Sequence, residues 1–205
     1  MAATGATVIE IDTPHGPARA HVQAAQRPSG ALVLGHGAGG GFGAPDLKAA
    51  TDAALAAGVS VALVEQPYRV AGRRSPAPAA QLDAAWIAIV EHLRAGSFAG
   101  LRLVAGGRSA GARVACRTAA QTGAVAILCL AFPLHPPGKP EKTRLSELDA
   151  VAVPALVVQG DSDPFGMPPS GPNRRIVVQP GNHSLKSDLV NLGAAVRDWL
   201  PTVLD

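Results

Sequence analysis

Short apolar runs recur along the chain and are separated by polar or glycine-rich turns. They fall at Val8–Ile11, Ala31–Leu34, Val59–Val64, Leu101–Ala105, Val125–Leu130, Ala155–Gln159 and Ile176–Gln179, and a weaker alternating run falls at Ala18–Gln23. Continuous apolar runs of this length are typical of strands that are buried on both faces. The pattern therefore predicts a sheet with most of its strands in the interior.

Helical spacing of apolar residues appears between these runs. The segments that show it are Pro45–Ala57, Leu82–Leu93, Ser109–Thr122 and Leu189–Leu200. Gly58, Gly123 and Pro201 follow three of them and are expected to end the helices. Because strand and helix alternate after the first two strands, we expect one α/β domain over residues 1–205. Its sheet should be mostly parallel and twisted, with an antiparallel start and helices on both faces.

Composition narrows the class of protein. Apolar residues make up 47% of the 205 positions and charged residues 16%, which excludes a disordered chain. A net charge of +3 is too small to predict nucleic-acid binding. The N-terminus has no signal-peptide pattern, and the longest nearly apolar run, Ala124–Leu134, is shorter than the roughly 20 residues that cross a bilayer. Cys116 and Cys129 are expected to be reduced core thiols, so we expect a cytoplasmic protein that binds no membrane.

The sharpest motif is Gly107-Arg108-Ser109-Ala110-Gly111, between an expected strand and an expected helix. A serine at the tip of such a turn has a strained backbone and an exposed hydroxyl, and its flanking glycines come into contact. The free N–H groups of the following helix favour an oxyanion at the same place. The motif predicts that Ser109 is a nucleophile.

Two further strand ends carry the groups that a serine nucleophile needs, a base and an orienting carboxylate. Asp161 and Asp163 follow one strand, and His183 follows the next. Parallel sheets gather such groups at the C-terminal ends of their strands. The order predicts a Ser109–Asp–His183 triad in which either aspartate is a candidate.

A glycine-rich loop, Gly35–Gly41, follows the strand Ala31–Leu34. Acyl transfer requires two N–H donors aimed at the developing oxyanion. We expect one from Ala110, the residue after the nucleophile, and the other from Ala38 or Gly39. His36 is expected to brace this loop.

The chain resembles the α/β-hydrolase superfamily, and within it the compact, lidless dienelactone-hydrolase-like group. Four segments carry the resemblance: the glycine-rich loop His36–Gly41, the serine turn Gly107–Gly111, the acid turn Gly160–Pro164 and the histidine turn Gly181–Ser184. The segment Phe132–Pro140 is similar to the small bacterial and testis-expressed-type relatives. The resemblance implies a single hydrolase domain without a large cap domain, and a serine hydrolase that cleaves esters, thioesters or lactones through an acyl-enzyme without a cofactor. In the superfamily the acid usually lies three residues after the glycine that closes its strand, which selects Asp163 over Asp161.

The charge pattern suggests a substrate class. Two stretches around the expected site, 66–82 and 92–140, contain arginines and a lysine but no Asp or Glu. They predict either a positive mouth for an anionic acyl substrate or a solubilising surface. The candidate substrate-binding residues are His36, Tyr68, Arg69, Arg73, Arg108, His135 and Lys139. For Tyr68 we favour a role as an anchor of its loop over one as a wall of the pocket.

Two other functions remain open. The fold can serve as a binding or scaffold protein without activity, and Gly35-x-Gly37-x-x-Gly40 with Glu65 matches a dinucleotide-binding fingerprint. The chain has no HExxH motif and no cysteine cluster, so no metal is expected. The expected partner is a small-molecule acyl substrate, with a homodimer as a further option.

Overall fold

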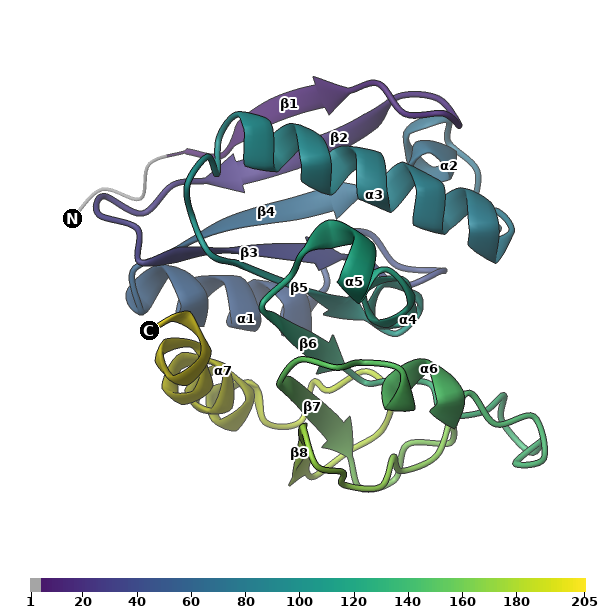
Figure 1. Cartoon of the computed structure of the whole chain (residues 1–205). Coiled ribbons are helices and arrows are strands. Elements are labelled where there is room, and N and C mark those ends of the chain that lie inside the picture. Colours follow the sequence, from purple (N-terminus) through teal and green to yellow (C-terminus); the bar gives the residue numbers. More distant parts are fainter. Residues whose placement is uncertain (1–4) are drawn as a thin grey trace.

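The computed structural model describes residues 5–205, and its centre is one eight-stranded sheet in the order β1-β2-β4-β3-β5-β6-β7-β8 (Figure 1). The strands are β1 (Thr7–Ile11), β2 (Ala18–Gln23), β3 (Gly30–Gly35), β4 (Val59–Glu65), β5 (Leu103–Arg108), β6 (Ala126–Leu130), β7 (Ala155–Gly160) and β8 (Arg174–Gln179). β2 pairs antiparallel with β1 and β4, and every other pairing is parallel. The predicted α/β fold with an antiparallel start is confirmed.

Helices cover both faces of this sheet. They are α1 (Pro45–Ala56), α2 (Pro67–Val70), α3 (Ala79–Ala95), α4 (Ala110–Arg117), α5 (Ala119–Thr122), α6 (Leu145–Asp149) and α7 (Leu189–Leu204). α1 and α7 pack on one face, and α3 and α4 pack on the other (Figure 1).

Two hydrophobic cores result, one on each face. Side chains alternate along a strand, so Ala31 and Val33 of β3 enter the core under α3, whereas Leu32 and Leu34 enter the core under α1 and α7. This double burial explains why the interior strands read as unbroken apolar runs. It also leaves the C-terminal ends of the parallel strands as one edge at which loops converge.

β5 differs from the prediction in a way that affects this edge. The strand was expected to end at Ala105, but it continues through Gly106 and Gly107 to Arg108. Gly107 pairs with Gly35 of β3 and Arg108 pairs with Leu130 of β6. The glycines that interrupt the apolar pattern are required there, because a Cβ on Gly106 would overlap the backbone of β6 at Leu128.

The helix after β5 is also shorter than predicted. Instead of one helix over Ser109–Thr122, α4 ends at Arg117 and α5 begins at Ala119. The hydroxyl of Thr118 donates to the carbonyl of Val114 at 2.7 Å, and such a bond competes with regular helix geometry. Gly123 ends α5 in the left-handed conformation, as its sequence position predicted.

Pro201 does not end the last helix, contrary to expectation. α7 runs through it to Leu204. The apolar face continues with Val203 and Leu204, both buried against the sheet, so packing outweighs the missing backbone donor. The short helices α2 and α6 had no sequence prediction.

The connection from β6 to β7 contains only one described helix, α6, and a loop that projects from the body of the molecule (Figure 1). No large cap domain is present in residues 5–205, which agrees with the prediction. Cys116 and Cys129 are buried free thiols whose Sγ atoms lie 3.5 Å apart, as expected for core thiols. Among the described helices, none is long and apolar enough to cross a membrane.

Candidate active site

Ser109 lies at the sharp turn between β5 and α4. Its φ of +52° and ψ of −110° are strained values for a residue with a side chain. A Cβ on Gly107 would lie 2.8 Å from the carbonyl carbon of Gly111, and a Cβ on Gly111 would overlap the backbone of Gly35. The three glycines therefore allow the turn to close beneath the serine, as the motif predicted for two of them.

Three side chains from different strand ends meet at this turn. The Oγ of Ser109 lies 2.9 Å from Nε2 of His183, and Nδ1 of His183 lies 2.8 Å from Oδ2 of Asp163. A carboxylate accepts from Nδ1–H, which leaves Nε2 free to accept the serine proton. Asp163 is 1% exposed and His183 16% exposed, so the acid is shielded while the base is reachable. These contacts are the geometry that an activated serine requires.

The structure separates the two candidate acids. Asp163 contacts His183, whereas Asp161 accepts a hydrogen bond from the backbone N–H of Gly181 at 3.0 Å. Asp161 thus links two loops and lies away from the imidazole ring. This is the arrangement that the superfamily resemblance implied.

Two residues near Asp163 had not been singled out from the sequence. Gln159 is fully buried at the end of β7, and its amide group donates to Asp163 Oδ2 at 2.8 Å and to the carbonyls of Phe132 and Gly166. All three partners are acceptors, which fixes the orientation of the amide. The Phe165 ring packs against the His183 ring with centroids 4.1 Å apart, and the Phe165 N–H donates to Asp163 Oδ1 at 2.8 Å. The signal for Gln159 was a polar residue closing an otherwise apolar strand.

The predicted oxyanion donors lie on two segments that flank Ser109. Ala110 is the first residue of α4, and Ala38 follows β3 in the glycine-rich loop. Within residues 5–205 neither backbone N–H donates to another group of the chain. Both donors are thus available to a ligand, as an oxyanion hole requires. Gly39 belongs to the same loop, and its Cβ position meets no atom within 4 Å.

His36 and Tyr68 hold the glycine-rich loop Gly35–Gly41 in place through hydrogen bonds. His36 is buried, its Nε2 accepts from the Gln66 N–H at 3.3 Å, and its Nδ1–H therefore donates to the Gly37 carbonyl at 2.8 Å. The Tyr68 hydroxyl donates to the Ala38 carbonyl at 3.2 Å. His36 matches the expected brace, and Tyr68 matches the anchor rather than a wall of the pocket.

Burial lowers the pKa of His36, against the opposing effect of its hydrogen bond to Gly37. The folded state thus disfavours the charged ring, while the unfolded state protonates near pH 6.5. We expect the free energy of unfolding to be constant above pH 6.5 and to fall below it, by at most about 1.4 kcal/mol per pH unit for this one group. Urea unfolding of wild type and His36→Gln between pH 5 and 8 measures it. A constant difference between the two proteins over this range contradicts the assignment.

The nucleotide-binding alternative finds no support in the same region. Glu65, which was to hold a ribose, lies 2.7 Å from Nε2 of His21. The ring of His21 is in turn stacked on Phe42 of the glycine-rich loop, with centroids 3.9 Å apart. α1 begins only at Pro45, so the loop does not lead directly into a helix N-terminus as pyrophosphate binding requires.

Three of the eight arginines in the acid-free stretches, Arg108, Arg113 and Arg117, are paired with carboxylates from elsewhere in the chain. Arg113 binds Glu147 with Nε and Nη2, and Arg117 binds Asp83 and Glu147. These pairs fasten α4 to α6 and α3. On α4 the acid-free stretch therefore forms ion pairs with acids from distant segments, whereas Arg69, Arg73 and Arg74 have no carboxylate partner among the described residues.

The other candidate substrate-binding residues are scattered. Arg108 is engaged by Asp46 and by the backbone of His183. Arg69 lies on α2 and Arg73 in the loop after it, where Arg69 donates to the Arg73 carbonyl at 3.5 Å. His135 packs against Gly166 beside the acid loop.

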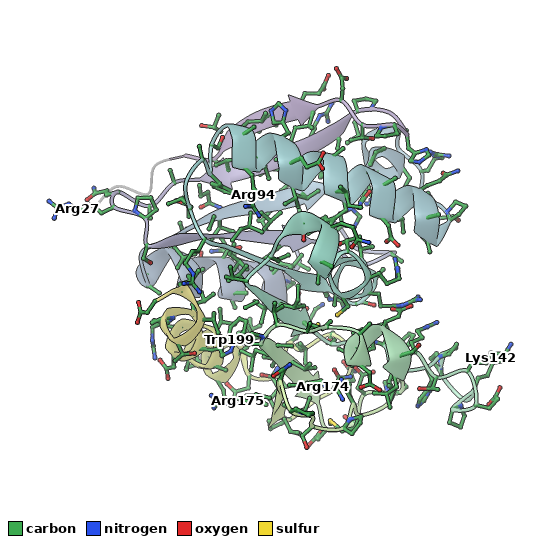
Figure 2. The ribbon with its side chains drawn as sticks, in the orientation of Figure 1. Arg27, Arg94, Lys142, Arg174, Arg175 and Trp199 are labelled. Atoms are coloured by element: carbon green, nitrogen blue, oxygen red, sulfur yellow. The ribbon has the colours of Figure 1, made fainter. Side chains whose placement is uncertain are left out.

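Lys139 is exposed in the projecting loop that also carries Lys142, which points away from the body of the molecule (Figure 2). No group of three or more metal-ligating side chains occurs in the part of the chain that the structure describes.

A family model described as an alpha/beta hydrolase domain matches residues 28–190. Among solved structures, XC6422 from Xanthomonas campestris, described as a serine hydrolase without a lid, is 22% identical with a TM-score of 0.79, over 97% of this chain and 96% of that one. Est1E from Butyrivibrio proteoclasticus is 16% identical with a TM-score of 0.79, over 98% and 99%. A dienelactone hydrolase from Anabaena variabilis is 14% identical with a TM-score of 0.77, over 100% of both chains. No curated protein matches the sequence. At these identities the structural likeness shows the fold.

Proposed function

Because the chain belongs to the alpha/beta hydrolase domain family and is a hydrolase by that membership, we propose that it cleaves ester-type bonds of small acyl compounds through Ser109, His183 and Asp163. The observation that carries the proposal is the continuous hydrogen-bonded relay from the Ser109 hydroxyl through His183 to Asp163. A chance contact of three polar groups would not also place the serine at a strained turn beneath two unused N–H donors.

The first half of the reaction acylates the enzyme. The Ser109 oxygen attacks the substrate carbonyl as its proton passes to Nε2 of His183. Asp163 holds the imidazole in the required tautomer and stabilises its charged form. The Ala110 and Ala38 N–H groups receive the oxyanion of the tetrahedral intermediate. When that intermediate collapses, His183 gives the proton to the leaving group and the acyl group stays on Ser109.

The second half releases the product. Water gives a proton to His183 and attacks the acyl carbonyl through a second tetrahedral intermediate at the same two N–H groups. Collapse breaks the bond to Ser109, whose oxygen takes the proton back from His183. The enzyme needs no cofactor in this scheme.

The substrate that fits best is a small ester, thioester or lactone. The part of the chain that the structure describes has no cap domain to enclose a long acyl chain, and Phe165, packed on the ring of His183, supplies apolar surface beside the site. Est1E, which shares the fold, is known with ferulic acid bound, an aromatic acid of modest size.

A weak preference for anionic substrates is expected. A cavity of about 430 Å³ is lined by Arg73 and Arg74 of the loop after α2 and by Gln81 of α3, and α2 itself supports the oxyanion loop through Tyr68. Exposed charges contribute about 1 kcal/mol or less, so kcat/KM should favour a carboxylate-bearing ester by about fivefold or less over its neutral analogue. High salt should remove the difference. Equal values at low and high salt contradict a role for these arginines.

Labelling by a fluorophosphonate probe tests the proposed function directly. Native wild type is expected to react stoichiometrically, and heat-denatured protein is expected not to react, since only the folded site activates the serine. Failure of well-folded wild type to react would overturn the proposal and favour a binding or scaffold protein with a hydrolase fold.

A further inference from the structure

A buried ion pair joins the residue before the nucleophile to the first turn of α1. Nε of Arg108 lies 2.8 Å from Oδ2 of Asp46, whose side chain is completely buried, while that of Arg108 is 18% exposed. The other oxygen of Asp46 accepts from the Leu47 N–H at 2.9 Å. Burial raises the pKa of Asp46 and the Arg108 guanidinium opposes that rise, so the carboxylate depends on its partner.

The same guanidinium reaches two other parts of the site. Its Nη2 donates to the backbone carbonyl of His183 at 3.1 Å. Its Nη1 packs against Gly37 so closely that a Cβ on Gly37 would lie 2.7 Å away. Gly37 is the residue before Ala38, the expected oxyanion donor.

These contacts attach His183 to the nucleophile turn at two points. The ring of His183 meets Ser109, and its carbonyl meets Arg108, the adjacent residue. One contact fixes a distance, whereas two contacts to neighbouring residues also fix the orientation of the loop. On its other side this loop is held to the acid turn, where Asp161 accepts from the Gly181 N–H.

We propose that Arg108, held by Asp46, is a positioning residue that sets His183 and the oxyanion loop on Ser109. The inference rests on the proposed function and extends it to a group that touches no reacting atom. A planar guanidinium with donors on three nitrogens reaches Asp46 and His183 from one side chain, and a lysine ammonium cannot span both.

Kinetics of Arg108 variants test the inference. We expect Arg108→Met to lower kcat about 10²-fold with KM nearly unchanged, because a misplaced base costs about this much. Arg108→Lys keeps the charge but loses the planar guanidinium with donors on separate nitrogens, so its kcat should still fall about tenfold. The double variant with Arg108→Met and Asp46→Ala should lose no more kcat than Arg108→Met alone, since both substitutions break the same ion pair.

Arg117→Met is the matched control. It also breaks a partly buried arginine–aspartate pair, with Asp83. This pair joins the C-terminal end of α4 to α3 and includes no contact with His183 or the oxyanion loop. We expect it to lower the melting temperature while kcat stays within about twofold of wild type. Equal losses of kcat in the two methionine variants, or full activity in Arg108→Lys, would overturn the proposal.

Hydrogen exchange keeps the test independent of turnover. The backbone amides of residues 181–187 should exchange faster in Arg108→Met than in Arg117→Met, because only the first loses a contact to the His183 loop. Should Arg108→Met not fold, Arg108→Gln replaces it with a shorter, uncharged polar side chain. Unchanged exchange at residues 181–187 in folded Arg108→Met contradicts the inference, whether or not the wild type hydrolyses esters. A folded wild type that hydrolyses no ester would by itself count against the proposed function alone.

Discussion

Ser109→Ala is expected to lower kcat for ester hydrolysis by about 10⁴- to 10⁶-fold and to abolish fluorophosphonate labelling. The reason is chemical, because the variant keeps the His183–Asp163 pair and the N–H donors but has no oxygen to form the acyl-enzyme. Initial rates on a chromogenic ester, with melting temperature as the control for folding, measure the effect.

Ser146→Ala is the matched control for this prediction. Ser146 is an exposed serine on α6 whose hydroxyl makes no hydrogen bond in the described structure, so the same substitution should leave kcat unchanged. Turnover that survives in purified Ser109→Ala, or that falls equally in both variants, would show that the serine is not the nucleophile.

Local sequence patterns predicted the parts of the site that backbone geometry dictates. Gly107 and Gly111 predict the turn because a side chain at either position would overlap the backbone. The strands that end at Gly160 and Gln179 bring Asp163 and His183 to the same edge of the sheet. Parallel strands order their C-terminal ends in space, so position along the chain becomes position in the site. The fold class and the layered arrangement followed from the same periodicity.

Contacts between segments that lie far apart in the chain were not predictable in this way. Nothing in the pattern around Arg108 indicates that Asp46 and the His183 carbonyl are its partners. Counting charges along the chain therefore could not show that Arg108, Arg113 and Arg117 are held in ion pairs by acids from distant segments. Gln159 shows the same limit, since its three acceptors lie on two loops, one after β6 and one after β7. The break between α4 and α5 at Thr118 was likewise not visible in the apolar spacing, which continues across it.

Asp163→Asn is expected to lower kcat by about 10⁴-fold, the size of effect seen when an orienting acid becomes an amide. The surroundings of Asp163 leave no suitable orientation for that amide. If its NH₂ faces His183, it also meets the Gln159 amide, and the imidazole must turn its proton toward Ser109. If its NH₂ faces the other way, it opposes the Phe165 N–H. In either case a donor meets a donor, and the base is held in the wrong tautomer or the wrong place.

Asp161→Asn is the matched control, two residues away on the same turn. The oxygen of an asparagine accepts from the Gly181 N–H as well as a carboxylate does, so kcat should stay within about threefold of wild type. The comparison separates a catalytic acid from a loop contact, because both variants remove one charge from the same turn. Equal losses in the two variants would mean that the charge of the turn matters rather than its contact with His183. A larger loss in Asp161→Asn would transfer the role of the acid to that residue and overturn the triad as assigned.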